Sequence, residues 1–289
     1  MRQAKSSSFT PNGLLARLSD HDAELMRPHL RPVTLGLHHG LEVVLQPVEN
    51  VYFLESGIAS MVAIQENGSR RVEMALFGRE GMSGCPVVLG DGRSPHGVFM
   101  QVAGAGQCIA SDDLRRAMAR SETLRAVLLR FVQTLWVQTA HTAVCNALSP
   151  LNVRLARWLL MCHDRVDGDE LRISHDLLAL LVGAPRADAT EGVEVLRSAG
   201  LIEVSRMNIT VTDRKTLVVV AGGSYGVPEA EYSRLLGSSP RPPDPTSCAT
   251  FASGSTRSFS RFGASHPPNL RPDPEAPLRS SPGARPTLG

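Results

Sequence analysis

The chain has 289 residues, of which 42% are hydrophobic and 4% aromatic, and its formal net charge at neutral pH is +2. This length and apolar content suffice for two domains with cores of their own. No apolar run approaches the roughly 18 residues that a membrane-spanning helix needs, and the N-terminal segment MRQAKSSSFTPNG lacks the apolar stretch of a secretion signal. We therefore expect a cytoplasmic protein.

Neither a metal site nor catalytic chemistry is indicated. The five cysteines are odd in number and include no CxxC pair, so we expect free thiols in a reducing compartment. The nine histidines show no metal-ligand spacing. Because no nucleophile–base pair or GxGxxG loop stands at a motif spacing, we predict no cofactor and no enzymatic activity.

The first 120 residues indicate an N-terminal β-domain. Residues 1–12 are polar, and we expect them to be disordered. Residues 14–30 favour one or two short helices. From Val33 to Ala110 short apolar alternations are punctuated by glycine, which is typical of a roll or barrel-like sandwich. The clearest hairpin turn is Gln65-Glu66-Asn67-Gly68, since Asn-Gly accepts positive φ.

The longest helical pattern covers residues 121–148, with Ser121 as its cap. Apolar and small polar residues recur at strict 4-3 spacing along it, and this first stripe predicts a coiled-coil dimer interface. The competing interpretation is a helix that packs this stripe onto the chain's own roll, but apolar side chains on other faces give the helix enough surface to contact both its own domain and a second copy. The first stripe consists of Leu124, Leu128, Phe131, Leu135, Gln138, Thr142 and Cys145.

The stretch from Ile173 to Ile202 predicts two short helices joined by a tight turn. Gly183 ends the first helix, because a glycine accepts the positive φ that turns the chain. The second helix should begin near Pro185 and bury Ala189, Val193 and Leu196. A helix-turn-helix that enters a DNA major groove is one interpretation, and an αα-hairpin that only packs a core is the other.

The flanking segments favour the first interpretation. Residues 201–204 and 208–211 alternate as two strands of a hairpin, and two helices followed by a hairpin make a winged helix. Pro150 interrupts the preceding helix and marks a hinge. After residue 236, 11 of the last 53 residues are proline, so we expect residues 237–289 to be a disordered tail.

These features resemble the Crp/Fnr superfamily of bacterial transcription regulators. The matching stretches are VYFLESGIAS (51–60), FGREGMSG (77–84), NVRLARWLL (152–160) and the helix-turn-helix itself. The resemblance implies an α+β fold in which a cyclic-nucleotide-binding-type β-roll (jelly roll), a long dimerisation helix and a C-terminal winged helix follow one another. The domains implied are a disordered segment 1–12, a sensor roll 13–120, a dimerisation helix 121–148, a DNA-binding domain 149–236 and the tail 237–289.

The effector cassette of the family departs from its pattern in this chain. In members that bind cyclic nucleotides, a glutamate follows the glycine and holds the ribose, whereas Gly84 is followed here by Cys85. The Arg-Ser pair that neutralises the cyclic phosphate is present as Arg93-Ser94. A ribose would lose a charge-assisted acceptor worth about 1.5–3 kcal/mol. We predict that the protein does not bind cyclic AMP in the usual way, and that its effector pocket is degenerate or takes an unidentified ligand.

The resemblance also assigns DNA-binding positions. Arg186 matches the arginine that contacts guanine, while Ala187 and Glu191 replace a glutamate and a second arginine, so the half-site should differ from the common one. Glu191 would accept from a cytosine amino group. Ser174 and His175 match phosphate contacts. The remaining outward positions are Asp188 and Thr190. The implied partners are double-stranded DNA, a second copy of the chain and RNA polymerase, with no membrane.

The charge balance argues against DNA binding. Residues 150–220 contain nine Arg/Lys and ten Asp/Glu, so any attraction to phosphate must come from the arrangement of the charges. All basic residues except Lys5 and Lys215 are arginines, whose guanidinium groups can form paired hydrogen bonds with phosphates and guanines. A ligand-binding or protein-interaction module that has lost DNA binding is therefore the alternative function.

Overall fold

The computed structural model describes residues 10–64, 71–173, 175–206 and 208–237. All of them belong to one compact unit, Met1–Cys248. The predicted domain boundaries inside this unit, and the disorder of residues 1–9 and 238–289, remain predictions. The hairpin turn predicted at residues 65–68 lies outside the described residues.

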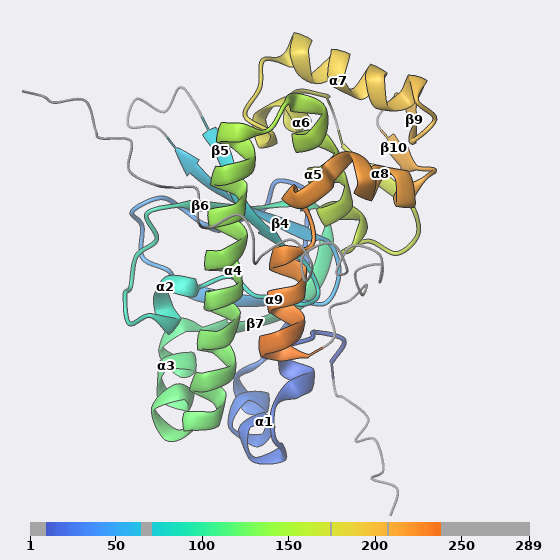
Figure 1. Cartoon of the computed structure of the whole chain (residues 1–289). Coiled ribbons are helices and arrows are strands. Elements are labelled where there is room, and N and C mark those ends of the chain that lie inside the picture. Colours follow the sequence, from blue (N-terminus) through green and yellow to red (C-terminus); the bar gives the residue numbers. More distant parts are fainter. Residues whose placement is uncertain (1–9, 65–70, 174, 207, 238–289) are drawn as a thin grey trace, which may run out of the picture. The chain divides into compact units, whose positions relative to one another are not determined.

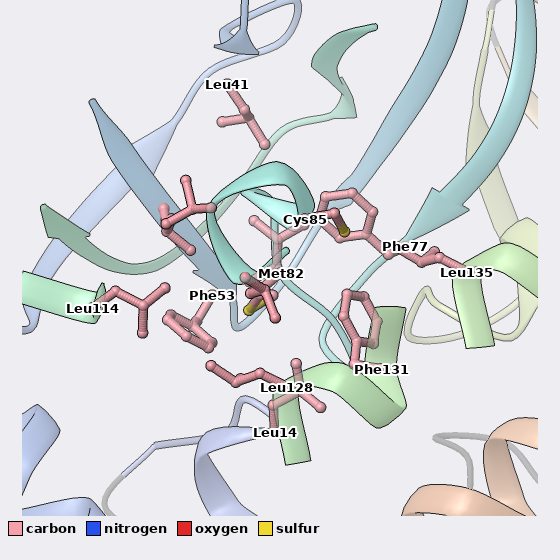
Figure 2. Packing of buried hydrophobic residues seen from close by; sticks show 14 of the residues in the cluster. Leu14, Leu41, Phe53, Phe77, Met82, Cys85, Leu114, Leu128, Phe131 and Leu135 are labelled. Atoms are coloured by element: carbon pink, nitrogen blue, oxygen red, sulfur yellow. The ribbon is translucent and has the colours of Figure 1, made fainter. Parts of the chain in front are cut away.

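Two antiparallel sheets build the N-terminal half, as the alternating pattern predicted (Figure 1). One sheet has the order β1-β7-β3 and the other β2-β6-β4-β5. Apolar side chains of both sheets meet in one core, shown in Figure 2, where Phe77 stands edge-on to Phe131 with ring centroids 6.3 Å apart. The predicted β-roll is thus confirmed. Its strands are β1 Arg31–Leu35, β2 Gly40–Glu42, β3 Asn50–Leu54, β4 Ile58–Ile64, β5 Arg71–Phe77, β6 Gly97–Val102 and β7 Gly104–Ala110.

The start of the described chain is ordered, which differs from the prediction. Asn12 is fully buried, and its side-chain amide donates to the carbonyl groups of Leu54 and Gly81. Its Oδ1 accepts from two backbone N–H groups of the next turn. Disorder is therefore the wrong prediction for residues 10–12. The short helices that follow are η1 Leu15–Arg17, α1 Asp20–Met26 and η2 Arg27–His29.

The long helix α4 forms as predicted, and its first turn is capped by the hydroxyl of Ser121, which accepts from the N–H of Leu124 at 3.1 Å. Ser121 also satisfies an orphan donor that the helix itself could not pair. The helices of this part of the chain are α2 Cys85–Val88, α3 Ser111–Arg120 and α4 Glu122–Leu148.

The first stripe of α4 lies in the chain's own core. Leu124 and Leu128 are fully buried, and Gln138 bonds through its side chain to both the N–H and the carbonyl group of Leu76 on β5. Thr142 is half-buried, and the other stripe residues are buried. The assignment of these residues to a dimer interface is wrong, because their apolar surface is used to hold α4 onto the roll. Leu124, Leu128, Phe131 and Leu135 belong to the core cluster of the roll, and Figure 2 labels the last three.

The opposite face of α4 carries a second stripe at the same 4-3 spacing, and all of its members are exposed. Trp136 is 70% exposed and Leu129 40% exposed. The other members are polar or small, so the face is flat between the large side chains. The second stripe consists of Leu129, Gln133, Trp136, Ala140, Ala143 and Ala147.

The C-terminal half is a winged helix, which also confirms the predicted fold. Pro150 caps its first helix, and a small antiparallel sheet of order β8-β10-β9 forms the wing. After residue 213, two helices separated by a short 3₁₀ turn close the domain. The elements are α5 Leu151–His163, β8 Glu170–Arg172, α6 His175–Leu181, α7 Arg186–Ser198, β9 Ile202–Ser205, β10 Asn208–Val211, α8 Arg214–Ala221, η3 Gly222–Ser224 and α9 Val227–Leu236.

The last helix, α9, returns from the winged helix and packs along α4 (Figure 1). Tyr232 and Leu236 enter the core of the roll, and the Tyr232 hydroxyl donates to the carbonyl group of Glu80 at 2.9 Å. Arg17 bonds to the carbonyl group of Leu236. The end of the described chain is therefore anchored on its N-terminal half. Within the described residues, no helix is long and apolar enough to cross a membrane.

Candidate nucleic-acid interface

The turn between α6 and α7 has the tight geometry that its sequence predicted. Gly183 adopts φ 62°, in the left-handed region that a side chain would disfavour. Arg154 of α5 donates to the carbonyl groups of Val182 and Gly183 and so satisfies acceptors left at the end of α6. The turn is thereby fixed to the body of the winged helix, which orients α7.

Helix α7 divides into the two predicted faces. Ala189, Val193 and Leu196 are at most 2% exposed and pack into the core of the winged helix. The predicted DNA-contacting residues of α7 are all exposed, namely Arg186, Ala187, Asp188, Thr190 and Glu191. The side chain of His175 and all of Ser174 lie outside the described residues, so their predicted phosphate contacts remain predictions.

A close crossing between α7 and α5 sets the distance between these two helices. Gly192 faces α5, and a Cβ atom placed there would lie 2.4 Å from a methyl group of Leu155. The absence of a side chain lets the two helices approach each other. The outward face of α7 is therefore held at a defined position relative to α5.

The wing follows α7 directly. In β9 and β10, Ser205 pairs with Asn208 and Val204 with Ile209. β8 completes the small sheet by pairing Arg172 with Asn208. Asn208 already belongs to β10, and residue 207 lies outside the described residues.

Charges on the exposed face of α7 are mixed. Arg197 binds Glu194 with both nitrogens, at 2.8 and 2.5 Å, and this hydrogen bonding lowers the pKa of Glu194. With that pair neutralised, the N-terminal turns of α7 present Arg186 beside Asp188 and Glu191. The first turns of α7 thus carry one guanidinium group and two carboxylates, a mixture that suits base edges better than a row of anionic phosphates.

A buried network that the sequence did not reveal joins the end of α5 to the start of α8 and to Tyr225. Asp164 accepts from Arg214 at 2.6 Å and from the Tyr225 hydroxyl at 2.7 Å. Burial raises the pKa of Asp164 to about 6, although the charge of Arg214 opposes this shift. These residues are 50 and 61 positions apart from Asp164, so no local motif signals the network.

The predicted effector residues do not form one open anion site. Ser94 and Cys85 are buried, whereas Arg93 is exposed. The N–H of Gly84 donates to a carboxylate oxygen of Glu42, at 2.6 Å. Burial raises the pKa of Glu42, while hydrogen bonds from Gly84 and Ser94 lower it. The acceptor that the sequence lacks at position 85 is replaced by one from β2, and it is already engaged by the protein.

The described residues thus combine a β-roll, a long helix and an exposed helix-turn-helix with a wing. Residues 153–219 match the model of the Crp-like helix-turn-helix domain. No curated protein matches the sequence significantly.

Solved structures show the same fold. A transcriptional regulator of the Crp/Fnr family from Eubacterium rectale superposes with a TM-score of 0.58 at 17% identity, covering 72% of this chain and 97% of that one. FixK2 from Bradyrhizobium japonicum gives 0.57 at 13% identity, with 66% and 96% covered. The c-di-GMP-responsive regulator CLP from Xanthomonas campestris gives 0.54 at 17% identity, with 67% and 99% covered. Residues 153–219 thus belong to the Crp-like helix-turn-helix family, and the chain shares the fold of these solved regulators.

Proposed function

We propose that the protein is a homodimeric, sequence-specific regulator that inserts α7 into the DNA major groove. The observation that carries this proposal is the exposed N-terminal face of α7 on a helix whose other face is locked by Gly192 and the apolar core. A recognition helix contacts base edges with residues of its first turns. A bacterial regulator of this kind works in the cytoplasm, and RNA polymerase is the further partner that we expect.

The exposed residues suggest how a half-site is recognised. Arg186 is suited to paired hydrogen bonds with O6 and N7 of a guanine. Glu191 would accept from a cytosine amino group, and Thr190 would contact either a base or a thymine methyl group. The small side chain of Ala187 makes no such hydrogen bond. The negative charge of Asp188 disfavours a phosphate group next to it. The half-site therefore differs from one recognised by two arginines.

Dimerisation is proposed through the second stripe of α4. Its 4-3 spacing is that of a coiled-coil seam, and Trp136 at its centre is 70% exposed. Burial of a Trp contributes strongly to association, because a large rigid surface is removed from water at little entropic cost. The three alanines that follow Trp136 in the stripe allow two helices to approach closely. Such a dimer leaves the first stripe in the core of each copy.

The roll is not proposed to bind cyclic AMP in the usual way. The buried carboxylate of Glu42 already accepts the Gly84 N–H, so an anionic phosphate entering there meets a like charge and an engaged donor. Equilibrium titration with a labelled cyclic nucleotide tests this proposal. We expect no saturable binding at micromolar concentrations, and a low-micromolar dissociation constant would contradict it.

A mobility-shift assay tests DNA binding itself. The DNA is the region upstream of the protein's own coding sequence, at low salt. Arg186→Ala should weaken the shift by about tenfold or more, since a paired arginine–guanine contact contributes about 1–3 kcal/mol. Arg234→Ala is the matched control, because it removes one exposed arginine from α9, far along the chain from α7. If neither variant nor the wild type shifts DNA, the alternative function as an interaction module replaces this one.

A further inference from the structure

A carboxylate is buried where the β-roll meets the DNA-binding half. Glu73 lies on β5 and is 3% exposed. Its Oε1 accepts from the indole N–H of Trp158 on α5, at 2.8 Å, while its Oε2 has no hydrogen-bond partner among the described residues. A buried charged oxygen without a partner costs free energy.

The surroundings of Glu73 are polar but uncharged on the sheet side. Ser60 of β4 donates to Gln101 of β6 at 2.6 Å, and Gln101 in turn donates to the sulfur of Cys162 on α5 at 3.4 Å. Apolar side chains of both halves, including Ile58 and Leu76, close around this group in one buried cluster with α5. The contact between the two halves therefore has a polar centre, defined here as the junction: Ser60, Glu73, Gln101, Trp158 and Cys162.

The cations near Glu73 are committed elsewhere. Arg165 is paired with buried Glu80 at 2.7 Å, and Arg157 donates to the Thr142 hydroxyl at 3.1 Å. Burial raises the pKa of Glu73 to about 7, although the hydrogen bond from Trp158 and the charges of Arg157 and Arg165 lower it.

The other side chains of the junction do not titrate in this range. Burial keeps the pKa of Cys162 well above the ordinary range of a thiol, so it stays protonated. Ser60 and Gln101, which β4 and β6 contribute to the junction, do not ionise. Glu73 is thus the junction group that changes charge near neutral pH.

We propose that Glu73 is a proton-operated contact between the roll and the DNA-binding half, closed when its carboxyl group is protonated and loosened when it is ionised. The proposal adds a form of regulation to the proposed function. It depends on that function only for its consequence at DNA, because docking of the two halves is measured without DNA.

The direction follows from proton linkage. Docking raises the pKa of Glu73 from 4.5 to about 7, so the docked form binds the proton more tightly than the undocked form. Docking is therefore strongest below pH 4.5 and weakens as the pH rises towards 7, above which the loss is complete. Between pH 5 and pH 8 the docking equilibrium should change roughly 70-fold if the undocked carboxyl group regains its ordinary pKa.

Fluorine NMR of the full chain labelled with 5-fluorotryptophan tests this directly. The chain has two tryptophans, Trp136 and Trp158, and a Trp136→Phe sample assigns their resonances. The Trp158 resonance should move with a midpoint near pH 7. In Glu73→Gln, which mimics the protonated form, it should stay at its low-pH position from pH 5 to 8.5. At pH 8, hydrogen exchange in β5 and α5 should be slower in this variant than in the wild type.

A second variant keeps the carboxyl group in place. Ser60→Ala removes a hydroxyl group that lies beside Glu73, so the midpoint should shift if Glu73 is the group that titrates. Burial raises the pKa of Asp164, inside the winged helix, to about 6. A change of the Trp158 resonance that came from Asp164 would therefore persist in Glu73→Gln. A Trp158 resonance that does not titrate, that titrates identically in Glu73→Gln, or whose midpoint Ser60→Ala leaves unchanged would overturn the proposal. DNA affinity plays no part in these outcomes, so they are independent of whether the protein binds an operator.

Discussion

Gly192 shows how one residue positions the recognition helix. A Cβ atom there would lie 2.4 Å from Leu155, so Gly192→Ala must push α7 away from α5 or move the buried leucine. We expect the free energy of unfolding to fall by about 1–3 kcal/mol, the usual cost of overpacking, and to outweigh the gain of about 0.5–1 kcal/mol that alanine gives inside a helix. Urea denaturation measures it.

Gly36→Ala is the matched control, because a Cβ atom at Gly36 would have no neighbour within 4 Å. Its stability should stay within about 0.5 kcal/mol of the wild type. A Gly192→Ala protein as stable as the wild type would contradict the close crossing of α5 and α7.

The outward residues of α7 could be predicted from the sequence, because helical periodicity alone separates Ala189, Val193 and Leu196 from their neighbours. The hydrogen-bond partners of isolated carboxylates could not be predicted from the sequence. Glu42 meets Gly84 across 42 residues, and no spacing rule connects a strand residue to a turn that distant. The sequence therefore indicated that a carboxylate acceptor is missing at position 85. The structure shows that Glu42 of β2 supplies an acceptor beside Gly84 instead.

Helix α9 is the element with the clearest stabilising role outside the region that matches the helix-turn-helix model. It brings Tyr232 and Leu236 into the core of the roll. A chain ending at Gly226 loses both side chains, each of which contributes about 1.5–3 kcal/mol through burial. We expect a clearly lower melting temperature by calorimetry. A chain ending at Gly237, which keeps α9, should melt like the full chain, and equal melting of both truncated chains would contradict the role of α9.

Helix α4 explains why one element was predicted correctly and its role was not. Two stripes at 4-3 spacing run along the same helix, and sequence periodicity does not say which one faces the chain's own core. Periodicity favours the more apolar stripe as a dimer interface, yet a stripe that is apolar along most of its length is what the roll requires for packing. The exposed stripe contains Trp136 and three alanines, and alanine is a weak signal of an interface.

At the scale of the whole molecule, the proposed pairing through the second stripe would decide how DNA is contacted. A two-fold dimer presents two copies of α7, and operators of such dimers have half-sites one helical turn apart, about 34 Å. Residues 150–220 contain nine basic and ten acidic residues, so their charges nearly cancel. A single copy of the chain therefore has little electrostatic attraction for DNA. Specific binding should therefore depend strongly on pairing.

Selection of binding sites from random duplexes, performed with the wild type and with Trp136→Glu, tests this account most directly. Val219→Glu is the control, since Val219 is 76% exposed on α8 and lies outside the stripe. We predict that the wild type and the control enrich a two-fold symmetric sequence with half-site centres about 10 base pairs apart, and that Trp136→Glu does not. Enrichment of a single unpaired half-site by the wild type, or of the same symmetric sequence by Trp136→Glu, would contradict it.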